Sequence, residues 1–398
     1  MDLLTGKRKS ISFVYMFRMN MKKIILTGWR LIAFLFIAST MALTPDNPKT
    51  LPIGSKAPDF NLKGIDGKMY TLASFKDAKI LVIVFTCNHC PTAQAYEERI
   101  KKLTDDYAGK GVKVIAIMPN SASALRYDEL GWSDEPDDYE GMIRRAKDKQ
   151  FNFPYLYDGD TEEASLKYGP VSTPHVFIFD TDRILRYAGR VDDEENFRKP
   201  IHVQDTRNAL DALLNNKPVP VETTKVFGCS IKWKTKSDWI DKANATWAKQ
   251  PVSLQNITAD SIKTLVKNKE GDKLRLINIW ATWCGPCVAE FPEFVKLSRI
   301  YRERDFEFIS ISADDSVNSD KALRFLKKQE SSGANYLFTG GNKYSLVEAV
   351  DPNWQGALPY TILVEPGGNI VYSSEGSVDP EELRRLIFNN KYIGRLFK

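Results

Sequence analysis

The feature that most constrains the fold of this chain is a strand–Cys-x-x-Cys–helix unit that occurs twice. Each unit begins with a continuous apolar run of the length of a buried strand, and helical periodicity follows the cysteines. The two units are Ile80–Phe85, Cys87, Cys90 and Pro91–Tyr107 in the first half, and Leu274–Ile279, Cys284, Cys287 and Val288–Arg304 in the second. The repetition predicts two domains built on the same plan.

The position of these cysteines predicts dithiol–disulfide chemistry. At a helix N-terminus, unpaired backbone N–H groups and the helix dipole stabilise a thiolate. A second cysteine one turn further on can close a disulfide with the first. We therefore predict that Cys87 and Cys284 are the attacking thiols. Cys90 and Cys287 would then resolve the mixed disulfides that form with a partner.

Strand and helix patterns alternate along the rest of the chain. This alternation predicts an α/β chain with two domains, each a mixed β-sheet flanked by helices. We expect the first domain at residues 51–220 and the second at residues 252–398. Residues 221–251, bounded by Pro220 and Pro251, would form a connector that contains the segment Gly228–Trp233.

The N-terminal residues carry a targeting pattern. Residues 1–42 contain seven basic residues and one acidic residue, and they end in the apolar run Leu31–Ala42. This run is shorter than the roughly 20 residues of a bilayer span, so we expect a secretory signal peptide and an exported, periplasmic protein. The alternative is an uncleaved inner-membrane anchor formed by residues 24–42. Because this segment carries a charge of +6 and the chain as a whole +5, the rest of the chain is close to neutral, and we expect no nucleic-acid partner.

Several motifs of the second domain agree with those of one known family. The motifs are Trp280–Cys287, Val288–Pro292 and Ala357–Thr361. They resemble TlpA-type periplasmic thioredoxins of the thioredoxin superfamily across almost the whole domain. The resemblance implies a thioredoxin-like fold and a cis bond before Pro359. We expect Trp283 to shape the surroundings of the site rather than to bind a cofactor. Asn278 stands where cytoplasmic thioredoxins have a buried Asp, which leaves Glu290 to assist proton transfer at Cys287, with a helix-surface charge as the alternative role.

The first domain carries a different set of motifs. They are Ala57–Phe60, Cys87–Pro91, Tyr155–Asp158, Thr173–His175 and Arg186–Asp193. They resemble peroxiredoxin-like (AhpC/TSA) redoxins of the thioredoxin superfamily, and the resemblance extends through the connector segment Gly228–Trp233. It implies a second thioredoxin-like fold, with Thr173 and a cis Pro174 beside the cysteine pair. A peroxidatic cysteine follows a Thr by three residues, and neither Cys87 nor Cys90 does, so we do not expect peroxide to be the main substrate.

The residues between the cysteines predict that the two sites differ. His89 places an imidazole next to the Cys87 thiolate, whereas Gly and Pro separate Cys284 from Cys287. A stabilised thiolate favours the reduced form, so we predict that the Cys87–Cys90 couple is at least ~30 mV more positive than the second couple.

Metal binding is the main alternative use of these side chains. Thiolates and imidazole suit Cu(I), so Cys87, Cys90 and His89 could form a copper site. A zinc site made of both cysteine pairs would need a much shorter spacing between them. His175 either faces the first cysteine pair or packs at the strand edge. We predict no metal and no organic cofactor.

The chain contains five cysteines, so Cys229 remains outside the two pairs. If the connector packs on the first domain, we predict a buried, inert thiol with a raised pKa. The alternative is a third redox thiol, which would have to reach Cys87 or Cys284.

These inferences predict an exported thiol–disulfide oxidoreductase that exchanges disulfides with partner proteins at two sites. Its partners would be protein thiols and disulfides, with a membrane thiol reductase as a candidate partner of the second domain. It would contact the membrane only through an uncleaved N-terminal segment. The alternatives are a metallochaperone with a copper-binding first domain and a thiol-reducing second domain, or a weak thiol peroxidase.

Overall fold

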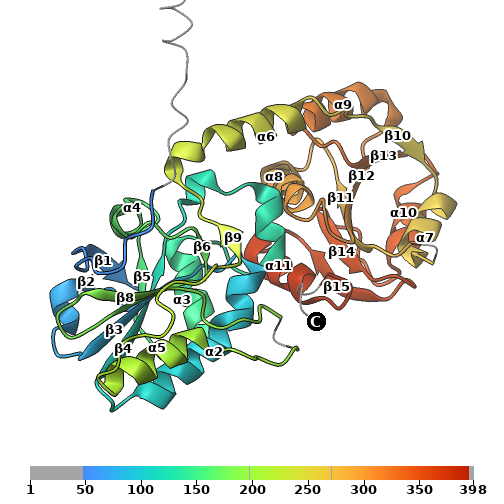
Figure 1. Cartoon of the computed structure of the whole chain (residues 1–398). Helices are drawn as coiled ribbons and strands as arrows, with labels where there is room; N and C mark the ends of the chain where they lie inside the picture. The colour runs from blue at the N-terminus through green and yellow to red at the C-terminus, as the bar shows by residue number, and fades with distance from the viewer. Residues whose placement is uncertain (1–47, 197, 270, 394–398) are drawn as a thin grey trace, which may run out of the picture. The chain divides into compact units, whose positions relative to one another are not determined.

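The computed structural model describes residues 48–196, 198–269 and 271–393 (Figure 1). The predicted signal or anchor segment, residues 1–42, lies outside these ranges. Among the helices of the described ranges, none is long and apolar enough to cross a membrane.

The first half of the described chain forms a seven-stranded mixed sheet in the order β2-β1-β5-β4-β3-β7-β8. The strands β3, β4 and β5 are parallel, and the remaining pairings are antiparallel. The strands are β1 (Asn61–Gly64), β2 (Met69–Thr71), β3 (Ile80–Phe85), β4 (Val112–Met118), β5 (Tyr155–Tyr157), β7 (His175–Phe179) and β8 (Leu185–Gly189). The first cysteine pair follows the central strand β3.

Helices cover both faces of this sheet, as Figure 1 shows. All six residues of β3 are buried, and alternate side chains enter two separate apolar clusters. This alternation follows from the pleat of a strand, which points successive side chains to opposite faces. The helices that pack on one face are α2 (Pro91–Tyr107), α3 (Tyr139–Asp148) and α5 (Asp205–Leu214), and those on the other are η1 (Leu72–Phe75) and α4 (Glu163–Tyr168).

The second half forms a six-stranded mixed sheet in the order β10-β13-β12-β11-β14-β15. β11 lies at its centre, parallel to β12 and antiparallel to β14, and the second cysteine pair follows it. The strands are β10 (Gln255–Ile257), β11 (Leu274–Trp280), β12 (Phe306–Ser312), β13 (Ala334–Phe338), β14 (Tyr360–Val364) and β15 (Ile370–Glu375).

This sheet is also covered on both faces. The helices on one face are α8 (Gly285–Ile300), α9 (Ser319–Lys328) and α11 (Pro380–Asn389), and those on the other are α7 (Ala259–Lys267) and α10 (Lys343–Val350). The predicted α/β fold with two mixed sheets, each flanked by helices, is confirmed. The helix α8 begins earlier than the predicted Val288, because Pro286 fits the first turn of a helix, where its missing N–H has no bond to lose.

The predicted connector has secondary structure of its own. It contains β9 (Cys229–Ser230), η4 (Lys234–Lys236) and α6 (Asp238–Ala248). The strand β9 pairs with β6 (Ser172–Thr173) in a small antiparallel sheet, which supports the expectation that this segment packs on the first domain. The remaining short helices are η2 (Ala122–Ala124), η3 (Tyr127–Trp132) and η5 (Ser316–Asn318).

Candidate active sites

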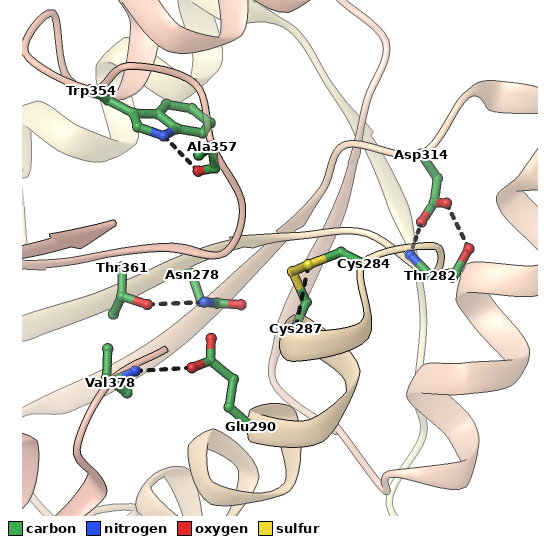
Figure 2. The surroundings of a disulfide bond; sticks show 10 residues. All are labelled: Asn278, Thr282, Cys284, Cys287, Glu290, Asp314, Trp354, Ala357, Thr361 and Val378. Carbon is green, nitrogen blue, oxygen red and sulfur yellow. Dashed lines mark hydrogen bonds between the residues drawn. A yellow bond between two sulfur atoms is a disulfide. The ribbon is translucent and has the colours of Figure 1, made fainter. Parts of the chain in front are cut away.

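The second cysteine pair lies where β11 ends and α8 begins. Cys284 is the N-cap residue of α8, and its sulfur accepts a hydrogen bond from the backbone N–H of Cys287 at 3.3 Å. The two residues form a disulfide, with their Cα atoms 5.3 Å apart (Figure 2). Cys284 is 6% exposed and Cys287 is 1% exposed, while Gly285 and Pro286 between them are exposed. The first cysteine of this motif therefore begins the helix, as predicted.

Two loops frame this disulfide. Asp314, which follows β12, accepts hydrogen bonds from the backbone N–H (2.9 Å) and the hydroxyl (2.7 Å) of Thr282, and so holds the loop before Cys284. The bond before Pro359 is cis, and Pro359 leads into β14, which pairs with β11. Trp283 is 65% exposed, so its ring is available at the surface of the site.

A buried carboxyl group lies one turn below the disulfide. Glu290 is 8% exposed, and its Oε2 accepts the backbone N–H of Val378 at 3.1 Å, while its Oε1 has no hydrogen-bond partner among the described residues. Burial raises the pKa of Glu290 to about 7, against the opposing effects of the hydrogen bond from Val378 and of the nearby Asn278 amide. Figure 2 shows the carboxyl group pointing towards Asn278, whose Nδ2 donates to Thr361 (3.0 Å). A carboxyl group that titrates near neutral pH can exchange protons with thiols under ordinary conditions.

The first cysteine pair is placed differently on its helix. The helix α2 begins at Pro91, and its N-cap is Cys90, whose sulfur accepts the backbone N–H of Ala93 at 3.4 Å. The prediction that Cys87 occupies the helix N-terminus is therefore wrong. The cause is local: Pro91 fits the first position of a helix, and Asn88 and His89 form the turn before it.

The helix terminus stabilises a thiolate at Cys90. Besides the bond from α2, the sulfur accepts the backbone N–H of Cys229 at 3.2 Å. Burial opposes ionisation, but hydrogen bonds with Cys229 and Cys87 and the charge of His89 outweigh it. The pKa of Cys90 lies well below that of an ordinary thiol. By contrast, burial raises the pKa of Cys87, and its hydrogen bond with Cys90 acts in the same direction. The Cys87 sulfur lies 3.0 Å from the hydroxyl of Thr173.

His89 is held by a carboxylate that sequence analysis did not identify. Its Nδ1 lies 2.6 Å from Oδ2 of Asp137, and the two side chains are almost completely buried. Burial lowers the pKa of His89, but the charge and hydrogen bond of Asp137 outweigh it and the net pKa is raised. Asp137 also accepts hydrogen bonds from the backbone N–H groups of Asn88 (2.8 Å) and His89 (2.9 Å) and from Asn120 (2.7 Å). A positive imidazole is therefore stabilised next to Cys90.

The same contacts weigh against a metal site here. The ligand atoms of Cys87, His89 and Asp137 lie within 4.8 Å of one another, which is compatible with a bound ion. A metal bound through Nδ1 of His89 would have to break the hydrogen bond between His89 and Asp137, and a metal on Asp137 would compete with the N–H groups that bind the carboxylate. The alternative copper site of Cys87, Cys90 and His89 gains no support from this geometry.

Beside the first cysteine pair, the proline loop connects β6 to β7. The bond between Thr173 and Pro174 is cis, and Cys90 in its thiol form donates to the Thr173 carbonyl at 3.3 Å. His175 accepts a hydrogen bond from the backbone N–H of Val171 (3.3 Å) and packs against Phe177. Burial lowers the pKa of His175 to about 3, so this histidine stays neutral. The packing role is the one that the structure supports.

Cys229 lies on β9, opposite Thr173 in the register of the β6–β9 pair. The predicted rise in its pKa is confirmed, and its main cause is the hydrogen bond with Cys90, with burial second. This half-buried thiol therefore belongs to the first site. The sequence could not indicate this contact, because nothing in the spacing of a fifth cysteine shows which pair it approaches.

Comparisons with known proteins find matches to both halves of the chain. The model of the AhpC/TSA family matches residues 53–188, and the Redoxin model matches residues 247–387. The thiol-disulfide oxidoreductase ResA of Bacillus thuringiensis is 26% identical over 132 residues, which are 31% of this chain and 72% of the relative. The thiol:disulfide interchange protein HelX of Rhodobacter capsulatus is 27% identical over 34% of this chain and 70% of its own length.

Two solved structures are also similar to this chain. An uncharacterized conserved protein from Geobacillus kaustophilus is 38% identical, with 47% of this chain and 94% of that chain covered and a TM-score of 0.42. A hypothetical protein from Sinorhizobium meliloti is 34% identical, with 47% and 97% covered and the same TM-score.

Proposed function

Because the chain belongs to the thioredoxin superfamily, with an AhpC/TSA and a Redoxin region, and is a thiol–disulfide oxidoreductase, we propose that it is an exported enzyme with two redox sites. Each site would exchange disulfides with partner proteins. The observation that carries this proposal is that one cysteine of each pair is the N-cap of a helix, Cys90 on α2 and Cys284 on α8. That position supplies backbone N–H groups to a thiolate.

At the second site, Cys284 is the attacking thiol. It caps the helix and is the more exposed member of its pair. Its thiolate attacks a partner disulfide, forms a mixed disulfide and releases one partner thiol. Cys287 then attacks Cys284, releases the second partner thiol and closes the disulfide that the structure contains. Glu290 would take the proton of Cys287, because its pKa of about 7 lets it change protonation state near neutral pH.

At the first site, the roles of the two cysteines are exchanged. Cys90 has the lowered pKa and is the nucleophile, whereas Cys87 is a buried thiol with a raised pKa and closes the disulfide. Asp137 fixes the position and charge of His89, and His89 in turn stabilises the Cys90 thiolate. The supporting roles of Thr173 and Pro174 are to position the sulfurs.

The N-terminal pattern and the relatives support the proposed location and partners. The basic, then apolar residues 1–42 support export, with an inner-membrane anchor at residues 24–42 as the alternative form. The similarity to proteins named thiol-disulfide oxidoreductase and thiol:disulfide interchange protein supports protein thiols and disulfides as substrates. A membrane thiol reductase is a suitable electron donor for the second site.

The test is reduction of insulin disulfides by the full chain with dithiothreitol as electron donor. We compare the wild type with the double variants Cys87→Ser/Cys90→Ser and Cys284→Ser/Cys287→Ser and with the variant that lacks all four thiols. Each double variant should lose part of the activity, and the fourfold variant should lose all of it. Full activity in the fourfold variant would refute the proposal, and an unchanged rate in one double variant would remove that site from it. Far-UV circular dichroism confirms that every variant is folded.

A further inference from the structure

The two cysteines of the first site are hidden from a protein partner. Cys87 is 3% exposed and Cys90 is not exposed at all. Thiol–disulfide exchange needs direct contact between the attacking sulfur and the sulfur attacked. Because Cys90, the nucleophile of this site, is completely covered, a bulky protein thiol would reach the pair more easily through a group nearer the surface.

Cys229 is the thiol that connects this buried pair to the surface. Its backbone N–H donates to the sulfur of Cys90 at 3.2 Å, and it is only half-buried. It lines a surface pocket together with His89 and Lys232. Nε2 of His89 is buried without a hydrogen-bond partner among the described residues.

The backbone of β9 holds Cys229 next to the first cysteine pair. The strand β9 pairs with β6 so that Cys229 lies opposite Thr173. Gly228 makes this approach possible, because a Cβ atom there would lie 1.9 Å from the Thr173 carbonyl oxygen, and its φ of +134° disfavours other residues. The segment is further fixed at Lys232, whose N–H donates to Oδ1 of Asn120 at 2.9 Å.

We propose that Cys229 is a third redox thiol of the first site, which forms a disulfide with Cys90 and so carries the disulfide of the buried pair to the surface. This inference rests on the proposed function of the first site, and it replaces the inert role predicted for Cys229.

The exchange balances without an added oxidant. In the Cys87–Cys90 disulfide, Cys90 is no longer the thiolate that raises the pKa of Cys229. Cys229 loses its proton and attacks Cys90; a Cys90–Cys229 bond forms, and Cys87 leaves and takes up the proton that Cys229 lost. A partner protein thiolate then attacks the sulfur of Cys229, and Cys90 leaves as a thiolate. A second partner thiol attacks the mixed disulfide, which releases Cys229 as a thiol. The partner dithiol is oxidised to a disulfide, and the Cys87/Cys90 pair is reduced by the same two electrons.

The electrostatics of the site favour the attack of the partner thiolate on Cys229 in the second step. A sulfur with a low pKa is the better leaving group in disulfide exchange, and the pKa of Cys90 is lowered. A thiolate that attacks the Cys90–Cys229 bond therefore expels Cys90 and becomes joined to Cys229. That result places the mixed disulfide on the more exposed residue of the two.

The first experiment traps the proposed bond. The full chain with Cys284→Ser/Cys287→Ser and Cys87→Ser is incubated with oxidised glutathione, alkylated and mapped without reduction. We expect a Cys90–Cys229 bridge in most molecules, and none in the matched variant that also carries Cys229→Ser. If Cys90 is recovered only as a thiol or as a glutathione mixed disulfide, the inference is wrong.

The second experiment measures access to the buried pair. In the Cys284→Ser/Cys287→Ser chain, the Cys87–Cys90 disulfide is reduced by reduced ribonuclease A or by dithiothreitol. We expect Cys229→Ser to slow the reaction with ribonuclease A at least tenfold and that with dithiothreitol less than twofold. Gly228→Ala, which keeps the thiol and disrupts its docking, should have the same effect. Equal rates with ribonuclease A in the presence and absence of Cys229 would refute this inference but not the proposed function of the site. If dithiothreitol cannot reduce the Cys87–Cys90 disulfide, the proposed function of the site itself is refuted.

Discussion

Replacing Asp137 by Asn tests how the first site controls the ionisation of its nucleophile. The substitution keeps the shape of the side chain, and the remaining oxygen can still accept the two backbone N–H groups that Asp137 binds. It removes the charge that raises the pKa of His89. His89 would become neutral at pH 7, because burial then dominates its ionisation. Cys90 would lose the positive neighbour that helps to lower its own pKa.

The expected size of this effect follows from the contacts. An opposite charge within a few ångström shifts a pKa by about 1–3 units, so the pKa of Cys90 should rise by that amount in Asp137→Asn. One unit corresponds to about 1.4 kcal/mol and to roughly 30 mV in a two-electron couple. The reduction potential of the Cys87–Cys90 couple should therefore become more negative by about 30–90 mV.

The assay follows the thiolate absorbance of Cys90 with pH in the Cys284→Ser/Cys287→Ser chain, together with a glutathione redox titration. Asp160→Asn is the matched control, because Asp160 is an exposed carboxylate that bonds only to Tyr157 among the described residues. An unchanged pH profile of Cys90 in Asp137→Asn would show that the His89–Asp137 pair does not act on the thiolate. A shift in both variants would point to a general effect of lost charge.

Three further predictions concern Glu290, the two potentials and peroxide. The folded-state pKa of Glu290 is raised to about 7, so its contribution to stability is present at low pH and is lost as the pH rises towards 7. In urea unfolding at pH 8, the free energy of unfolding of Glu290→Gln should exceed that of the wild type by at most about 3 kcal/mol. At pH 5 the two values should be nearly equal. Equal values at both pH values would contradict this prediction. The reduction potential of the Cys87–Cys90 couple should be at least ~30 mV more positive than that of Cys284–Cys287, and His89→Ala should reduce this difference. Glutathione titrations that give the two potentials in the reverse order would refute this. Stopped-flow mixing with hydrogen peroxide should show no oxidation at peroxiredoxin-like speed at either pair, and a fast reaction would restore the peroxidase alternative.

The sequence was informative wherever local patterns decide the structure. The helix predicted at Pro91–Tyr107 has these bounds in the structure, because a proline at its start and a regular apolar face mark it. The central strands were equally clear, since a continuous apolar run of strand length signals a strand buried on both faces. By contrast, α10 (Lys343–Val350) and β13 (Ala334–Phe338) were not predicted, because both are short and their apolar residues form no long periodic pattern.

Of the candidate sites, only the cysteine pairs could be identified from the sequence. The cysteine pairs stand out by spacing, but Asp137 lies in a polar stretch far along the chain from His89, and only the folded chain brings them together. The contact between Cys229 and Cys90 depends in the same way on the pairing of β9 with β6. The wrong assignment of Cys87 to the helix N-terminus came from expecting the first cysteine of each motif to cap its helix, whereas α2 begins after the second cysteine.

The different helix starts at the two sites affect how freely each site can change during evolution. Gly285 and Pro286 are exposed, so new residues there face solvent and can retune the second disulfide while the core stays intact. Asn88 and His89 occupy the same two positions of the first motif but are 1% and 3% exposed. A substitution at either position alters the packing of the interior as well as the chemistry. The reduction potential of the second site can therefore change by mutation without a change in folding stability. At the first site, selection must act on the reduction potential and the stability together.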